Sequence, residues 1–172
     1  MGLANVPSGY SLNLVDYDND GWLDLYVAND SHPNYLYENR KNGTFEELGF
    51  PIGAAVSEDG GEQGSMGVAV GDYDNSGHFS LFVSNFSEEY AALYKNNVDH
   101  FTDVSFRSKI AAASLPFVKW GTSFLDYDND GLLDIIVANG HVYPQVDQVP
   151  MGASARYRER SLLKREVLPE DV

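Results

Sequence analysis

An aspartate-rich segment of nine residues occurs three times along the chain and restricts the folds that the chain can adopt. The copies begin at residues 16, 72 and 126, which gives a period of about 55 residues. Repeats of this length are typical of stacked units such as propeller blades. The three copies are Asp16-Tyr-Asp-Asn-Asp-Gly-Trp-Leu-Asp24, Asp72-Tyr-Asp-Asn-Ser-Gly-His-Phe-Ser80 and Asp126-Tyr-Asp-Asn-Asp-Gly-Leu-Leu-Asp134.

Short runs of branched and aromatic residues flank each copy and predict strands. One such run follows each copy and ends in Asn, and the first two units continue with a third strand and with a fourth that begins at Phe45 or Phe101. Asn42-Gly43 is a strong hairpin signal between two of these strands. The predicted strands after the copies are 25–29, 81–85 and 135–139, and the third strands are 35–39 and 92–96.

Each unit is therefore predicted to be one four-stranded antiparallel β-propeller blade, with the aspartate-rich segment joining its first two strands. No segment has a helical hydrophobic period over three turns, so we expect an all-β fold. The expected blades are residues 1–50, residues 51–107 with the altered Asp loop, and residues 108–172.

The third unit departs from the pattern after Asn139. Its third strand is not expected until Leu162-Leu163, so residues 140–160 form a long insert, and no fourth strand is predicted in 164–172. Propellers typically contain about four to eight blades. We therefore expect about three blades of a larger propeller, with the remaining blades of the full-length protein as partners.

The complete copies have the chemistry of a calcium loop. Calcium prefers six to eight oxygen ligands, and carboxylates at positions 1, 3, 5 and 9 with a backbone carbonyl at position 7 supply them. An EF-hand is excluded, because it needs an acid at position 12, where the chain has Val27 or Val137 within a predicted strand. The predicted calcium ligands are Asp16, Asp18, Asp20, the carbonyl of Trp22, and Asp24 in the first loop, and Asp126, Asp128, Asp130, the carbonyl of Leu132, and Asp134 in the third.

The middle copy predicts at best a weak metal site. Positions 5 and 9 are serines, so Asp72, Asp74, Ser76 and the carbonyl of His78 are the only ligands offered. A metal-free Asx-type turn is the alternative, and in this loop it is favoured.

Composition excludes several classes of partner. The net charge of −15 would repel nucleic acid and anionic membranes, and no apolar run approaches the roughly 20 residues of a membrane span. No secretion signal is recognisable in 1–10. There are no catalytic motifs such as Gly-x-Ser-x-Gly or His-Glu-x-x-His, so no enzyme is expected.

We therefore expect a binding module with structural calcium, which recognises a protein or a glycan. Two alternatives remain open at this point: a carbohydrate-active propeller hydrolase or lyase, and a fragment of a longer protein without a function of its own. His141, Tyr143, Gln145 and Asp147 of the insert could line a ligand site, or could form a polar loop that packs on a neighbouring blade.

The chain resembles the FG-GAP/VCBS repeats, which also form integrin α-subunit propellers, and in particular the cartilage acidic protein and ASPIC/UnbV group. The stretches that carry the resemblance are 16–39, 67–96 and 120–148, the last with its Asn-Gly-His-Val-Tyr-Pro run. The resemblance implies a calcium-stabilised propeller of about seven blades that is extracellular, periplasmic or on the cell surface. It assigns the metal positions to the same aspartates of the first and third loops, and only in part to Asp72, Asp74 and Ser76.

Overall fold

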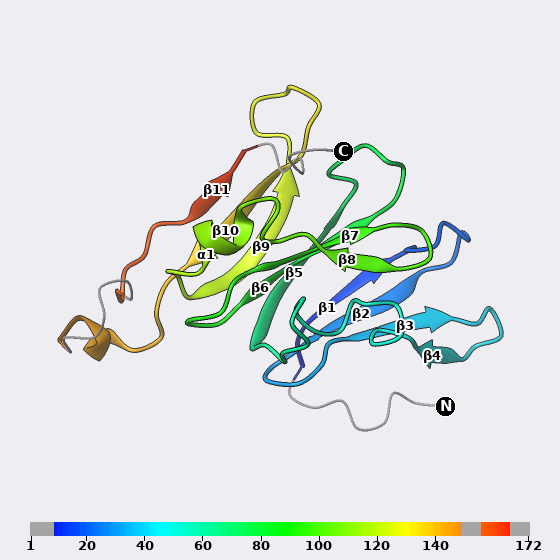
Figure 1. Ribbon diagram of the computed structural model, residues 1–172, viewed down its shortest axis with the longest axis horizontal. Helices are drawn as coiled ribbons and strands as arrows, with labels where there is room; N and C mark the ends of the chain where they lie inside the picture. The colour runs from blue at the N-terminus through cyan, green and yellow to red at the C-terminus, as the bar shows by residue number, and fades with distance from the viewer. Residues whose placement is uncertain (1–8, 149–155, 166–172) are drawn as a thin grey trace.

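The computed structural model describes residues 9–148 and 156–165, and its strands form three antiparallel sheets (Figure 1). The strand pairing confirms the all-β prediction, and each sheet places neighbouring strands in sequence order. The first sheet contains β1 (Gly9–Val15), β2 (Asp24–Asn29), β3 (Tyr35–Asn39) and β4 (Phe45–Glu47). The second contains β5 (Ser65–Gly71), β6 (Ser80–Asn85), β7 (Ala92–Asn96) and β8 (Phe101–Asp103), and the third contains β9 (Lys119–Leu125), β10 (Asp134–Asn139) and β11 (Leu162–Lys164).

The three sheets are equivalent residue by residue. In the pairing of the second and third strands, Leu25 faces Tyr37, Leu81 faces Tyr94, and Ile135 faces Lys164. The third strand of the third unit therefore starts where the sequence predicts it. The predicted boundaries at 50/51 and 107/108 fall in the connections between sheets. The prediction that no fourth strand follows β11 concerns residues from 166 onwards and lies outside the described part of the chain, as does 149–155 of the insert.

Two short helices depart from the all-strand prediction. The helix α1 (Ile110–Ser114) lies in the connection from β8 to β9, and the 3-10 helix η1 (Pro144–Gln148) lies in the insert. Each has only five residues, which is too few for a helical hydrophobic period to show in the sequence. The helix α1 is held by packing, because Ile110 is buried in the core between the second and third sheets.

The core consists of two apolar clusters, one on each face of the middle sheet. Tyr26 and Leu36 of the first sheet pack against Leu81 on one face. On the other face, Phe82 packs against Ile135 of the third sheet. Successive residues of a strand point to opposite faces, so Leu81 packs in the cluster with the first sheet and Phe82 in the cluster with the third. The inner strand β5 contacts β1 on one side and β9 on the other, as blades around a common axis do.

The outer faces of the first and third sheets are uncovered by the described residues. Leu12 is 56% exposed, whereas its equivalent in the middle sheet, Val68, is 7% exposed. At the other end Ile136 is 40% exposed, and its equivalent Phe82 is fully buried. Apolar positions that are buried between sheets in the middle of the array therefore face solvent at both of its ends.

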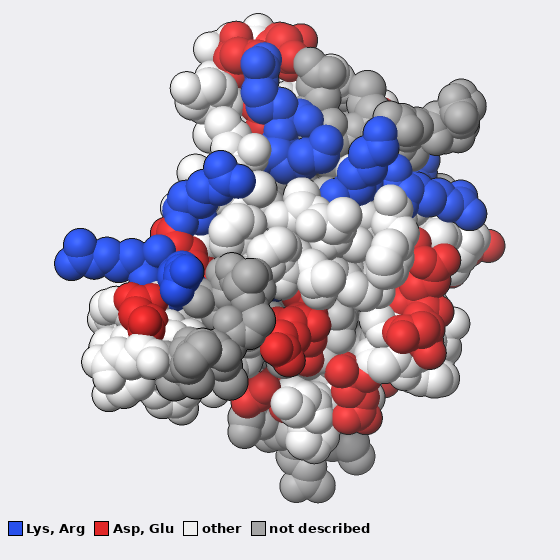
Figure 2. All heavy atoms as spheres, turned by 60° about the vertical axis from the view of Figure 1, so that its left-hand side comes forward, with Lys and Arg blue, Asp and Glu red and all other residues white. Residues whose placement is uncertain are grey.

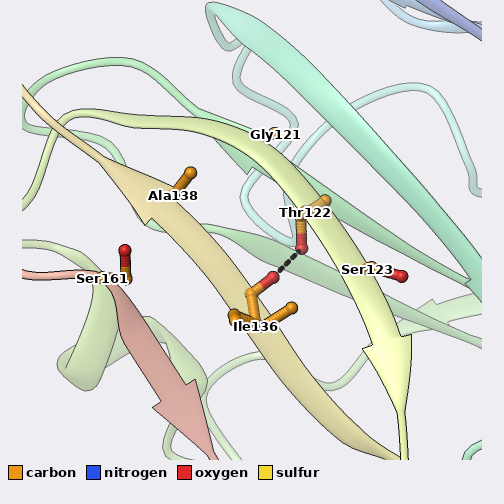
Figure 3. A pocket seen from close by; sticks show the side chains of 6 residues that line it. All are labelled: Gly121, Thr122, Ser123, Ile136, Ala138 and Ser161. Atoms are coloured by element: carbon orange, nitrogen blue, oxygen red, sulfur yellow. Dashed lines mark hydrogen bonds between the residues drawn. The ribbon is translucent and has the colours of Figure 1, made fainter.

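A hollow of about 280 Å³ lies on the uncovered face of the third sheet (Figure 3). The side chains of Ile136 and Ala138 on β10 lie beside 121–123 of β9, and the hydroxyl of Thr122 donates to the carbonyl of Ile136 at 2.8 Å. Few polar groups of this hollow are available to a ligand, so it is better described as a packing face than as a binding pocket.

A buried lysine joins the second and third units. Lys119, at the start of β9, has no exposed surface, and its ammonium donates to the carbonyls of Phe86 at 3.1 Å and Glu89 at 2.7 Å in the β6–β7 loop. It also donates to the carbonyls of Ser114 and Phe117. Burial lowers the pKa of Lys119 to about 8, against the opposing effect of the Glu89 and Glu159 carboxylates. The side chain therefore replaces backbone hydrogen bonds at a junction of two blades.

Candidate metal centres

The three aspartate-rich loops share one backbone conformation. Each places an Asn at position 4 in the left-handed region, with φ of 58° at Asn19, 54° at Asn75 and 60° at Asn129. The glycine at position 6 follows with φ between 83° and 87°. Asn and Gly are the residues that adopt these angles at least cost, which is why the motif is Asn-x-Gly in every copy.

In the first loop, three of the four predicted carboxylates come together. The carboxylate of Asp16 accepts the N–H groups of Asp20 and Gly21, both at 2.9 Å, which folds the loop around it. Oxygen atoms of Asp16, Asp18 and Asp24 all lie within 4.8 Å of one another. This is the spacing at which three carboxylates can share one cation.

Asp24 has a structural role in addition to its charge. It is 1% exposed, and its two oxygens accept the N–H of Asn39 at 2.8 Å and the N–H of Tyr17 at 3.3 Å. Burial raises the pKa of Asp24 to about 6, although these two hydrogen bonds oppose the shift. The carboxylate thus ties the loop to the end of β3.

Burial also raises the pKa of Asp18, and the neighbouring carboxylates of Asp20, Asp16 and Glu38 add to the effect. A cation near Asp18 would remove this penalty, because it favours the ionised form. The electrostatics of the first loop therefore fit a bound cation.

Asp20 is not part of the cluster in the first loop. One of its oxygens pairs with the ammonium of Lys41 at 2.6 Å, and the other accepts the N–H of Trp22 at 2.8 Å. The assignments of Asp20 and of the Trp22 carbonyl as ligands stay predictions.

The third loop brings together a different trio. Oxygens of Asp126, Asp128 and Asp130 lie within 4.8 Å of one another, and Asp126 accepts the N–H groups of Asp130 and Gly131. Asp134 is buried and accepts the N–H of Tyr127 at 3.0 Å, outside this cluster. The guanidinium of Arg165 pairs with Asp128. The ligand roles of Asp134 and of the Leu132 carbonyl stay predictions.

The middle loop forms the same turn with fewer acids. The carboxylate of Asp72 accepts the N–H groups of Ser76 and Gly77, both at 2.9 Å, just as Asp16 does in the first loop. Asp74 pairs with Lys95 at 3.1 Å. The hydroxyl of Ser80 accepts the N–H of Asn96 at 3.0 Å, which replaces the bond that Asp24 makes. No group of three acids forms in this loop among the described residues, so its geometry is that of an Asx-type turn.

His78 of the middle loop faces the first loop. Its Nδ1 lies 3.0 Å from the side-chain amide of Asn19, which also donates to the carbonyl of Gly77 at 2.9 Å. The imidazole ring of His78 thus links the middle loop to the first loop. The ligand role of the His78 carbonyl stays a prediction.

One determinant of these loops was missed from the sequence. Glu38, Lys95 and Arg165 occupy equivalent positions in the three units. Each directly follows the residue that pairs with the second residue of the second strand, namely Tyr37, Tyr94 and Lys164. At this position the second and third loops thus receive a cation, from Lys95 and from Arg165. The first loop has the Glu38 carboxylate there, which pairs with Arg40 at 2.6 Å. Aligning Tyr-Glu-Asn39 with Tyr-Lys-Asn96 shows the exchange of an acidic for a basic residue. That this residue lies beside the Asp loop follows only from the strand register.

The three antiparallel sheets and the loops that join their first two strands have the architecture of β-propeller blades. A family model described as "FG-GAP-like repeat" matches residues 16–83, which confirms the resemblance seen in the sequence. This match covers the first loop, the middle loop and the strands between them.

Among curated proteins, the chain is similar to cartilage acidic protein 1 from several vertebrates. It is 29% identical to the protein of Homo sapiens over 139 residues, which are 80% of this chain and 20% of that protein. It is 23% identical to the protein of Xenopus tropicalis over 142 residues, which are 81% of this chain and 21% of that protein. The chain thus spans about a fifth of the length of the relatives it matches. Within the described residues, no helix is long and apolar enough to cross a membrane.

Proposed function

We propose that this chain is a calcium-stabilised part of a propeller that acts outside the cell as a binding module. The observation that carries the proposal is the approach of Asp16, Asp18 and Asp24 to within 4.8 Å of one another at the end of a blade. The same carboxylates hold the turn between β1 and β2 and the end of β3, so a cation there stabilises the blade itself. Metal is structural in this proposal, and the chain is not an enzyme.

The donor set supports calcium over other metals. Every side chain of both clusters is a carboxylate, and hard oxygen ligands suit calcium, magnesium or manganese rather than zinc or copper. Magnesium demands a smaller and more regular shell, so a cluster drawn from positions 1, 3 and 9 of an irregular loop favours calcium. We take a dissociation constant of about 0.1–1 mM for each site, the range of extracellular calcium-binding modules.

The uncovered faces support a role within a larger assembly. Leu12 and Ile136 occupy positions that are buried in the middle sheet, so further blades of the same kind are the natural cover for both faces. We propose that the loops of the completed propeller then present the surface that recognises a protein or a glycan.

Thermal unfolding in calcium, in magnesium and in chelator tests this proposal. At about 1 mM calcium, one site with a dissociation constant near 0.1 mM adds about 1.4 kcal/mol to the free energy of unfolding. The first site alone would raise the melting temperature by roughly 3–6 °C in a chain of this size, and the third loop, where Arg165 pairs with Asp128, should add less. Magnesium at the same concentration should give a much smaller rise. A cooperative transition at the same temperature in all three buffers would refute the calcium assignment.

A further inference from the structure

A second polar site lies at the end of the third blade opposite the Asp loop. It is a depression of about 540 Å³, open to solvent, where β9 begins and β10 ends. Its lining comes from Trp120, from 139–142 and from 157–159. None of these residues belongs to the proposed metal centres, since the Asp loop joins the other ends of the same two strands.

Hydrogen bonds hold the walls of this depression in place. The indole N–H of Trp120 donates to the carbonyl of Gly140 at 2.7 Å. The N–H of His141 donates to the carbonyl of Tyr157 at 3.2 Å, and the N–H of Tyr157 donates to Asp147 at 3.0 Å. The strand end and the returning segment are therefore fixed to each other, so a ligand would meet a preorganised surface.

Aromatic rings surround the depression and continue into the second blade. Phe86 contacts Trp120 edge-to-face, with 6.1 Å between ring centroids, and His141 at 6.4 Å. The rings of His141 and Tyr143 lie 5.7 Å apart. Tyr143 is 63% exposed and Tyr157 is 40% exposed. Exposed aromatic rings beside a shallow hollow suit a sugar, because the C–H face of a pyranose packs on the electron-rich face of an aromatic ring.

The same segment is basic in an otherwise acidic chain. Residues 156–165 contain five of the 11 Lys and Arg residues and a single acid, Glu159, whereas the whole chain has a net charge of −15. Figure 2 shows Lys and Arg side chains gathered over this side of the molecule. Arg165 pairs with Asp128, and Arg160 lies over the ring of Phe117. Arg158 lines the depression and has no carboxylate partner among the described residues.

One further donor, on His141, and one acceptor, the carboxylate of Glu159, complete the surface. The Nδ1 atom of His141 accepts the N–H of Tyr143 at 3.0 Å, so in the neutral ring the proton is on Nε2, which can donate to a hydroxyl group. Glu159 already accepts the N–H of Val118 at 2.8 Å, which orients its carboxylate.

We propose that this depression binds a carboxylate-bearing sugar unit, such as a uronic or sialic acid, with the Arg158 guanidinium on the carboxylate and the exposed tyrosine rings against the sugar. The proposal rests on the proposed role as a binding module and names its ligand. Arginine forms two parallel hydrogen bonds to a carboxylate, which gives it selectivity for this group. The net charge of −15 opposes the approach of long polyanions such as nucleic acids, but one carboxylate in direct contact depends mainly on short-range hydrogen bonds.

Calorimetric titration of the full chain in 1 mM calcium tests this assignment, at about physiological ionic strength. The first pair of probes is cellotetraose and its C6-oxidised form, a tetramer of glucuronic acid, and the second pair is lactose and 3′-sialyllactose. Within at least one pair, the acidic probe should bind at least about tenfold more tightly than the neutral one. The pair that responds identifies the source of the carboxylate.

Matched variants locate the binding. Arg158→Gln should remove the preference for the acidic probe, and Arg158→Lys should restore only part of it. Tyr157→Ala should weaken both probes of the pair that responds. Arg107→Gln is the control, because it removes the same charge from an exposed position outside the depression. Near-ultraviolet circular dichroism of each variant verifies its fold.

Equal binding of acidic and neutral probes, equal losses in Arg158→Gln and Arg107→Gln, or no saturable binding would overturn the proposal. The calcium-dependent shift in melting temperature, measured on the same samples, separates this failure from that of the proposed function. A normal calcium shift without sugar binding refutes only the sugar site.

Discussion

The first and middle Asp loops have the same turn but different charges. Asp16 and Asp72 accept the same pair of backbone N–H groups, at the same 2.9 Å distances. A single carboxylate at position 1 is therefore enough to form the turn. The additional acids of the first loop serve another purpose, and a shared cation is the purpose that their spacing supports.

The difference extends to the strand beside the loop. Glu38 adds negative charge near Asp18, whereas its equivalent Lys95 pairs with Asp74 at 3.1 Å. The pKa of Asp18 is raised, first by burial and then by its acidic neighbours. Burial acts in the same direction on Asp74, but hydrogen bonds from Ser76 and Lys95 outweigh it and lower the pKa. At position 3, Asp74 of the middle loop therefore pairs with a lysine of its own blade, whereas no ion pair holds Asp18 of the first loop among the described residues. In the first loop the lysine, Lys41, pairs with Asp20 at position 5 instead.

The largest expected effect comes from Asp24→Ala. This change leaves the buried N–H groups of Asn39 and Tyr17 without their acceptor and also removes a proposed calcium ligand. We expect a loss of about 4 kcal/mol in the free energy of unfolding at 1 mM calcium, measured by urea denaturation. Asp24→Ser, which copies Ser80, should keep part of the hydrogen bonding and lose about half as much. Equal losses in the two variants would mean that the hydrogen bond to the end of β3 contributes nothing.

Replacing the aspartate at position 3 by asparagine should change the calcium response of the first loop but not that of the middle loop. Asp18→Asn should abolish the calcium-dependent stabilisation from the first loop, about 1.5 kcal/mol at 1 mM calcium. The matched change Asp74→Asn should leave the calcium response intact and should weaken only the pairing with Lys95. Melting curves with calcium and with chelator measure both responses. Calcium responses reduced equally by the two variants would show that the loops do not differ in metal binding.

The middle loop should gain a metal when it is given the acids of the first. The triple variant Ser76→Asp, Ser80→Asp, Lys95→Glu copies positions 20, 24 and 38. We expect one additional calcium ion per chain by equilibrium dialysis and about 1 kcal/mol of extra calcium-dependent stabilisation. The double variant that keeps Lys95 is the control, and it should bind more weakly because the ammonium still occupies Asp74. Unchanged stoichiometry in the triple variant would mean that side-chain charge does not decide where metal binds.

Most of the blade pattern was predictable from the sequence, because short runs of branched and aromatic residues and a repeated aspartate-rich turn leave a clear local signal. The starts of β3, β7 and β11 follow from residue type alone. The short helix α1 was not predictable, since Ile110 is held by packing between two blades rather than by helical periodicity. The pairing of Lys95 with Asp74 and the burial of Lys119 depend on strand register and on contacts between sheets, which local sequence does not encode.

The smallest expected effect is on how the free energy of unfolding depends on pH. The contribution of Asp24 should change with pH in opposite directions with and without calcium. Since the pKa of Asp24 is raised from 3.8 to about 6, the folded chain in calcium-free buffer holds a proton there that the unfolded chain has released. This carboxyl group therefore contributes less stability as the pH rises from about 4 to 7, and Asp18 acts in the same direction. Asp74 changes the stability in the opposite direction. Its pKa is lowered in the folded chain, so its ionised carboxylate stabilises the fold, and this contribution is lost only as the pH falls below about 3.8.

Urea denaturation of the wild type and of Asp24→Ser at pH 5, 6 and 7 measures this effect, with the variant subtracted to remove contributions from other groups. In calcium-free buffer the difference in unfolding free energy should fall by about 1 kcal/mol between pH 5 and pH 7. In calcium it should rise over the same interval, because a metal ion binds the ionised carboxylates and competes with protons. If the difference rises with pH even without calcium, Asp24 is ionised at little cost in the free loop. The contrast between the first and middle loops would then reduce to hydrogen bonding alone.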